Sequence, residues 1–252
     1  KLYKDSKRMH GLWTAATEAF RAGNKDYDYG PYKVASFSEP FGEKLGDILM
    51  HQDAVKAFEE TEYDSHTTFT DIDASVANMV LARVALTSGQ YDIAATAAGK
   101  VIADGYALMD EAAYTTSGFQ EGTLSETIWA YDWAQATSLE NASFASWISK
   151  TAIDTGSNKG IYMCIDQQLY DQIPDTDYRK KNFVKEAEGN YPAYIAVKFN
   201  SANYRQDEVY MRLSEAYLLK AEAEARNNQA SAAQTTLYNL VSQRDSAYEK
   251  SS

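Results

Sequence analysis

Residues 74–108 read ASVANMVLARVALTSGQYDIAATAAGKVIADGYAL, and this stretch decides the fold. Apolar residues recur in it at spacings of three and four, which predicts a helix over residues 73–88. Gly89 follows, and glycine readily takes the left-handed conformation that ends a helix. A second helix is expected over residues 92–103, with its alanines facing the first. Two helices joined by such a tight turn predict an antiparallel hairpin.

A second pair of helices is expected over residues 207–227 and 230–246. The two hairpins can be overlaid so that these pairs coincide: Gly89 with Asn228, Ala82 with Ala221, Ala94 with Ala233, Ala98 with Leu237 and Val101 with Leu240. Small residues at the helix contact and a left-handed residue at the turn are typical of tetratricopeptide-like pairs. Any two amphipathic hairpins could overlay as well, so periodicity alone leaves the repeat open.

The remainder of the chain is expected to be poorer in regular structure. Ser, Thr, Gly and Asn dominate residues 106–160. The other expected elements are helices at 1–22, 50–61 and 167–172, a loop at 24–46, a strand at 126–133 and a weaker strand at 191–199. The predicted fold class is therefore mainly α: tetratricopeptide-like helical hairpins in a single domain over residues 1–252, with a loop-rich insertion at 106–206 that contains a few short β-strands.

Composition excludes some classes of partner. The formal net charge is −12, and an acidic chain is repelled by nucleic-acid phosphates and anionic lipid. The sequence contains no run of about 18 apolar residues, which is the length needed to span a bilayer. The one cysteine, Cys164, is expected to be a small buried hydrophobe. The first and last residues look like cuts in a longer protein, so any export or lipid signal would lie upstream.

Residues able to perform catalysis or hold a metal ion do not form a recognisable motif. The histidines are far apart in the sequence, and Asp171, Asp175 and Asp177 suit a turn better than an acid–base pair. The loop at 154–160 faintly resembles a calcium loop, but Ile165 stands where the closing glutamate should be. Arg212 and Glu215 are expected to pair along one helix, and Arg83 to pair similarly. No catalytic residue, metal or cofactor is predicted.

Aromatic side chains give the candidate ligand site. Aromatic rings stack on the flat C–H faces of sugars, while amides and carboxylates bind the hydroxyls. The predicted binding residues are Trp133, Trp147, Tyr162 and Asn158, which stand among polar, loop-like segments. Trp129 and Tyr131 are instead expected to lie in the core of the strand. A second candidate patch contains Tyr27, Tyr29 and Tyr32.

An ordered set of segments resembles the SusD/RagB family. The set comprises the Ala-rich hairpin at 74–108, Glu126-Thr127-Ile128-Trp129, Asp177-Tyr178-Arg179, Lys198-Phe199, the segment from Asp207 to Leu218 with its Arg212-Leu213-Ser214-Glu215, and Leu237 to Val241 with Arg244. The resemblance covers about residues 70–250, and residues 1–69 match loosely at Gly30-Pro31-Tyr32. The lipid-anchor cysteine and the C-terminal motifs of the family are not in the sequence.

The resemblance implies a function. It implies a SusD-like nutrient-binding lipoprotein on the extracellular face of the outer membrane, held there by an N-terminal lipid upstream of this chain. The protein would capture an oligosaccharide or polysaccharide, or in some relatives a peptide, for a SusC-like TonB-dependent transporter, without catalysis. The alternatives are a tetratricopeptide adaptor that binds protein or peptide in a groove, and a glycoside hydrolase with facing acids.

Overall fold

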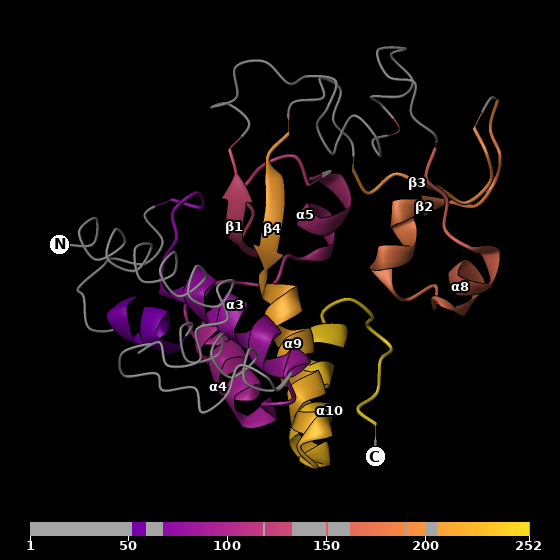
Figure 1. Ribbon diagram of the computed structural model, residues 1–252. Helices are drawn as coiled ribbons and strands as arrows, with labels where there is room; N and C mark the ends of the chain where they lie inside the picture. Colours follow the sequence, from indigo (N-terminus) through magenta and orange to yellow (C-terminus); the bar gives the residue numbers. More distant parts are fainter. Residues whose placement is uncertain are drawn as a thin grey trace, which may run out of the picture.

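The computed structural model describes residues 52–58, 68–117, 119–132, 150, 162–189, 191–199 and 206–251 (Figure 1). Four helices, α3, α4, α9 and α10, lie in a row, and a two-stranded ribbon of β1 and β4 stands above one end of the row. A smaller lobe carries α8, β2 and β3. The expected helix at 1–22 and loop at 24–46 lie outside the described residues.

The first hairpin forms as its sequence predicts. Helix α3 spans Ala74–Thr87 and α4 spans Tyr91–Ile102. The Asp73 side chain caps α3, because its Oδ1 accepts a hydrogen bond of 2.9 Å from the Val76 amide. Gly89 has a φ of 77°, the left-handed conformation that the turn requires. Residues 52–58 are also helical, within the expected 50–61, and pack on this hairpin with Val55 buried.

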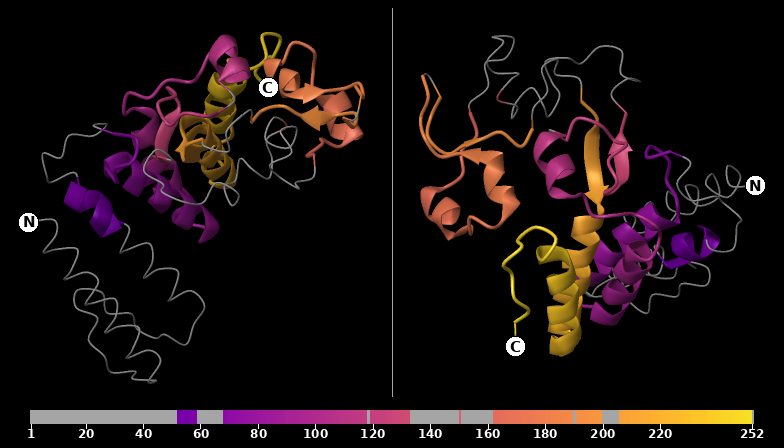
Figure 2. Two further views of the ribbon diagram at one scale, coloured as in Figure 1. Left: turned by 90° about the horizontal axis from the view of Figure 1, so that it is seen from above. Right: turned by 180° about the vertical axis from the view of Figure 1, so that it is seen from behind.

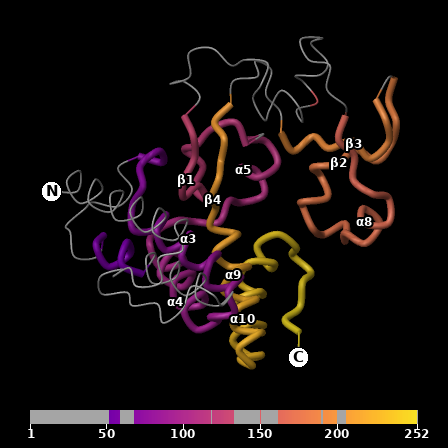
Figure 3. Tube along the Cα trace, viewed as in Figure 1, coloured from indigo at the N-terminus to yellow at the C-terminus, as the bar shows by residue number. Residues whose placement is uncertain are grey.

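The second hairpin begins later than expected. Helix α9 spans Leu213–Arg226 and α10 spans Ala230–Val241, whereas Glu208–Arg212 form strand β4. The prediction of helix from residue 207 was therefore wrong for its first turns. Val209 and Tyr210 favour a strand, and β4 gains a partner in β1. The tube in Figure 3 runs from β4 directly into α9. Asn228 turns the hairpin with a φ of 60°, matching Gly89.

The two hairpins pack directly on each other despite the long insertion between them. Helix α9 lies against α4, and α3 also touches α9 (Figure 2). Alanines allow this close approach: Ala85, Ala94 and Ala223 are buried together. The two predicted helical hairpins are therefore present and packed together, with small residues where the helices meet.

The ribbon joins segments that are far apart in the sequence. Strand β1, Thr127–Tyr131, pairs antiparallel with β4, and register shifts interrupt the ladder on either side of Trp129. Ile128 and Met211 point into a core shared with Val76, Met79, Val101 and Ala216. The amide of Leu213, the first residue of α9, donates to the Glu126 carbonyl over 2.8 Å. The ribbon is thereby fixed to the helical row.

The rest of the insertion is short helices and minimal strands. Helix α5, Glu111–Thr116, follows its cap Asp110 and was not expected. Helix α8 spans Gln167–Gln172, as predicted. A 3₁₀ turn, η3, spans Tyr178–Asn182, and β2 (Phe183–Val184) pairs antiparallel with β3 (Ile195–Ala196). The strand expected at 191–199 is thus two residues long.

Cys164 corrects another expectation. It forms an isolated bridge to Ile195 and is exposed, not buried. The described ranges contain no helix long and apolar enough to cross a membrane, and no cluster of three His, Cys, Asp or Glu side chains able to hold a metal ion.

Candidate functional site

Three aromatic side chains gather on the β1–β4 ribbon, and we call Trp129, Tyr131 and Tyr210 the aromatic patch. Tyr131 is 41% exposed and Tyr210 47% exposed, while Trp129 is half-buried. The Trp129 and Tyr210 rings lie 5.2 Å apart between centroids and are tilted by 47°. The expectation that Tyr131 lies in the core is wrong, because Ile128 and Ala130 form the buried face of the strand.

Contacts with two neighbouring elements hold the patch in place. The Trp129 indole N–H donates to the Thr70 carbonyl over 3.3 Å. The Arg83 guanidinium reaches from α3 and donates to the Tyr210 carbonyl over 3.0 Å. Arg83 also makes bonds of 2.6 and 2.7 Å to the Glu215 carboxylate on α9, and this pair raises the Arg83 pKa. The Trp129 ring and the backbone of Tyr210 are therefore both held in place.

The Arg83–Glu215 pair replaces the expected pair of Arg212 with Glu215. Because Arg212 belongs to β4 and Glu215 to α9, the two side chains do not share a helix face. Glu215 instead meets a partner from the other hairpin, so the ion pair joins the two hairpins.

The chemistry of the patch suits a ligand with both flat apolar faces and hydroxyls. Exposed aromatic rings bury apolar area with little loss of side-chain entropy. The Tyr210 hydroxyl lies 3.3 Å from the Glu208 carboxylate. Partial burial, and next the Glu208 charge, raise the pKa of Tyr210, so its hydroxyl keeps its proton at neutral pH and can donate as well as accept.

The residues predicted from the sequence are placed unevenly. Trp133, Trp147 and Asn158, and the second candidate patch of Tyr27, Tyr29 and Tyr32, lie outside the described residues. Tyr162 is described, and it packs edge-on against Tyr191 with ring centroids 5.4 Å apart. It stands two residues before the Cys164 bridge and belongs to the smaller lobe, away from the aromatic patch.

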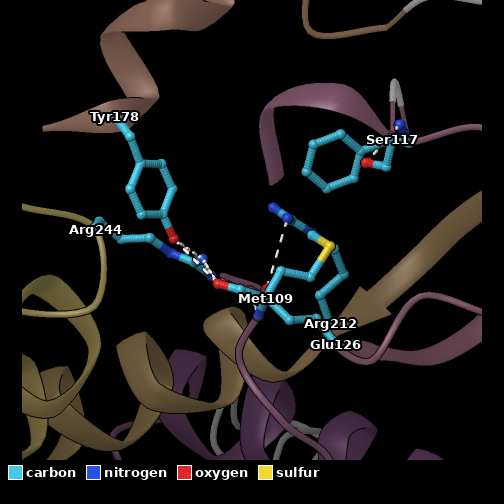
Figure 4. A network of polar contacts seen from close by, with 7 residues as sticks. Met109, Ser117, Glu126, Tyr178, Arg212 and Arg244 are labelled. Carbon is cyan, nitrogen blue, oxygen red and sulfur yellow. Dashed lines mark hydrogen bonds and ion pairs between the residues drawn. The ribbon is translucent and has the colours of Figure 1, made fainter. Parts of the chain in front are cut away.

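A buried polar cluster lies beside the base of the same ribbon (Figure 4). Glu126 has no exposed area, and Arg244 is 2% exposed. The Arg244 guanidinium bonds the Glu126 carboxylate, the Tyr178 hydroxyl and, over 2.7 Å, the Met109 carbonyl. The Met109 amide donates to Glu126 over 2.8 Å. This cluster ties the chain after α10 to the start of β1 and to η3.

Two further cations stand on the other side of Glu126. Arg212 Nη1 lies 3.8 Å from Glu126 Oε2, and the Arg212 guanidinium stacks on Phe119 at 4.9 Å. The Lys198 ammonium lies over the same ring at 4.6 Å. Burial, and next the Arg212 charge, lower the pKa of Lys198 to about 8. We call Glu126, Tyr178, Lys198, Arg212 and Arg244 the charge cluster.

Sequence analysis did not predict that these residues meet, although each belongs to a segment that carried the family resemblance. Glu126 opens the strand segment, Tyr178 lies in the Asp-Tyr-Arg turn, and Arg244 ends the last segment. The presence of one charged or polar residue in each segment was the only sequence feature that could have indicated the cluster. Tyr210 was also missed as a surface aromatic, because its segment was expected to be helical.

Comparison with known proteins identifies the family. The family model described as "SusD family" matches residues 12–245. A SusD-like carbohydrate-binding protein from Bacteroides vulgatus superposes with a TM-score of 0.67 and 22% identity, over 83% of this chain and 44% of that one. A SusD superfamily protein from the same species gives 0.66 and 18%, over 87% and 50%.

A third similar structure contains a ligand. Surface glycan-binding protein A from Bacteroides thetaiotaomicron, in complex with laminarihexaose, superposes with a TM-score of 0.60 and 15% identity, over 83% of this chain and 55% of that one. The present chain spans about half the length of these relatives. No curated protein sequence matches it. Because the family model matches most of its length, the chain belongs to the SusD family.

Proposed function

We propose that this chain is the oligosaccharide-binding part of a cell-surface nutrient-capture protein. It binds glycan without cleaving it and passes the glycan to a SusC-like TonB-dependent transporter. The bound structure of surface glycan-binding protein A supports this proposal, because that relative of similar fold holds laminarihexaose.

The single observation that carries the proposal is the aromatic patch. A half-buried tryptophan and two exposed tyrosines stand together on a ribbon braced from α3. Clustered exposed aromatic groups are uncommon on a protein surface without a binding role. Trp133 follows Tyr131 by two residues, so we assign Trp133 to the same proposed sugar site. Trp147, Asn158 and Tyr162, the last of which lies in the smaller lobe, are separate candidates for contact with the ligand.

Membership of the family supports a proposed location and partner. We place the protein on the extracellular face of the outer membrane, anchored by a lipid. The row of packed helices is the rigid surface that would meet the transporter, since its alanine-rich contacts leave little room for rearrangement. A tetratricopeptide adaptor remains the second candidate, because the two hairpins do stack like successive repeats.

A glycan array followed by calorimetry tests the proposal. The full chain should bind at least one class of oligosaccharide, and Tyr131→Ala and Tyr210→Ala should each weaken that binding. Trp133→Ala and Trp147→Ala test the predicted residues in the same assay. The matched control is Tyr238→Ala, which removes a tyrosine from α10, away from the ribbon.

The same samples separate binding from hydrolysis. Oligosaccharide incubated with the chain should be recovered intact by chromatography, whereas shortened products would support the glycoside hydrolase alternative. An array without any binding, together with capture of peptides by the helical row, would support the adaptor instead.

A further inference from the structure

The charge cluster contains more positive charge than its own carboxylate can balance. Lys198, Arg212 and Arg244 surround the single carboxylate of Glu126. Glu126 Oε1 already accepts from Arg244 and from the Met109 amide. The nearest described carboxylate oxygen to Arg212 is Glu126 Oε2 at 3.8 Å, which is too long for a hydrogen bond, so both that oxygen and Arg212 Nη1 are buried without a hydrogen-bond partner.

Arg212 differs from every other described arginine. Arg83, Arg179, Arg226 and Arg244 each donate at least one hydrogen bond to a carboxylate. Arg212 donates none in the described part of the chain, and its Nη1 is enclosed without an acceptor. Its side chain is 27% exposed, and Nε and Nη2 are not among the enclosed donors. The guanidinium therefore has donors that solvent or a ligand can reach.

Lys198 likewise makes no hydrogen bond to a carboxylate of the described residues. Its ammonium makes cation–π contacts with Phe119 and Phe199, at 4.6 and 5.2 Å, and no ion pair with a carboxylate of the described residues. A half-buried ammonium without a carboxylate is costly. Lys198 and Arg212 both contact the Phe119 ring, so an acidic ligand bound beside this ring would be attracted by two positive charges.

The backbone at the shared ring is held in an unusual conformation. Phe119 has a φ of 51°, which a bulky side chain seldom adopts, and its ring is buried. The following loop is fixed to the start of β4, because the Gly122 amide donates to Asp207 over 2.7 Å and the Asp207 amide donates to Gln120 over 2.9 Å. Strained residues that their surroundings hold in place cluster at ligand sites.

We propose that Arg212 and Lys198 form an anion subsite that binds a carboxylate of an acidic sugar, such as a uronic acid in a glycan. The planar fork of an arginine matches a carboxylate, and the lysine adds a second charge-assisted bond. The inference rests on the proposed glycan binding and narrows its substrate class.

The test compares a trigalacturonate with its neutral methyl ester, titrated into the full chain by calorimetry. The wild type should bind the acid form about tenfold more tightly, as expected for a charge-assisted pair. Arg212→Gln and Lys198→Gln should each bring the two ligands to within about twofold of one another. Arg226→Gln changes an arginine at the end of α9 that is paired with Glu222, and this variant should keep the preference.

A footprint provides a direct readout that does not depend on oligosaccharide length. Acetylation of Lys198, followed by peptide mass spectrometry, should be slowed by galacturonate and not by galactose. Equal affinity for the acid and the ester, or a preference that survives both variants, would overturn the inference. A preference for galactose 6-sulfate over galacturonate would contradict the carboxylate assignment.

The outcomes also separate this inference from the proposed function. Neutral oligosaccharides bound as tightly as acidic ones would leave glycan capture standing and end the anion subsite alone. If no sugar, neutral or acidic, binds or shields Lys198, both proposals fail.

Discussion

The two ends of the β1–β4 ribbon have opposite character. At one end, Glu126 and Arg212 belong to the charge cluster, where Glu126 has no exposed area. At the other, Tyr131 and Tyr210 face solvent. The same two strands thus carry a buried polar anchor and an exposed aromatic surface. The comparison teaches that Glu126, bonded to Arg244, fixes one end of the ribbon to the fold, whereas the aromatic rings at the other end present exposed surface to a ligand.

Removing the buried carboxylate should produce the largest effect. Glu126→Ala leaves Arg244 enclosed without its counter-charge, and breaking a buried pair in this way costs about 3–5 kcal/mol of unfolding free energy. Urea denaturation measures the loss. Glu222→Ala, which breaks an exposed pair with Arg226, is the control and should cost far less. Equal losses for the two variants would show that the charge cluster is not an anchor.

The pH dependence of stability should reveal the uncompensated lysine. The pKa of Lys198 is about 8 in the fold and 10.5 without the fold's influence. Between these values the unfolded chain binds more protons, so the contribution of Lys198 to stability rises with pH. It is most unfavourable below pH 8 and vanishes above pH 10.5. Arg212 and Arg244 face the ammonium, and Glu126 opposes them.

Lys198→Met isolates this effect, since methionine preserves the contact with Phe119. At pH 7 the variant should be more stable than the wild type by about 1–3 kcal/mol, and the gap should narrow above pH 8 and close above pH 10.5. Urea denaturation of both proteins at several pH values measures the gap. A stability difference that stays constant across this pH range would refute the claim that Lys198 carries an uncompensated charge.

The aromatic end should respond in affinity and not in stability. Tyr210→Ala removes an exposed ring, so the affinity for a bound oligosaccharide should fall by about tenfold, equivalent to about 1.4 kcal/mol. The free energy of unfolding should change by less than about 1 kcal/mol. Calorimetry and urea denaturation of the same preparation check both values. Unchanged affinity would place the sugar elsewhere.

The smallest effect sharpens the role of that ring. Tyr210→Phe keeps the stacking surface and removes the hydroxyl that lies near Glu208. Affinity should change by no more than about threefold if stacking dominates the contact. The same calorimetric assay distinguishes the two contributions, and a loss as large as that of Tyr210→Ala would assign the binding to the hydroxyl.

Local patterns were sufficient to predict the helical hairpins. The apolar spacing of residues 74–102, and the turn residues Gly89 and Asn228, depend on neighbours within a few positions of the chain. The alternation of β1 was also readable, although the choice of buried face was not: the chain buries Ile128 and leaves Tyr131 outside. A strand pattern separates two faces but does not say which one meets the core.

Long-range pairing could not be predicted from the sequence. Residues 208–212 form a strand because β1 supplies a partner from a distant segment, which overrides the helical periodicity. Glu215 pairs with Arg83 and not with its sequence neighbour Arg212, because packing of the two hairpins brings a distant residue close. The charge cluster combines residues from five segments, and nothing in local spacing states that their side chains meet. Cys164 was judged by its residue type, which is a weak guide to exposure at a chain edge.

One paired measurement tests the central claim, that the ribbon divides into an anchor and a binding surface. Unfolding free energy and oligosaccharide affinity should be determined for Tyr178→Phe, which removes the hydroxyl bonded by Arg244, and for Tyr210→Ala. We predict that Tyr178→Phe loses about 1–2 kcal/mol of stability and keeps its affinity, whereas Tyr210→Ala does the reverse. Loss of affinity in Tyr178→Phe with none in Tyr210→Ala would contradict the account.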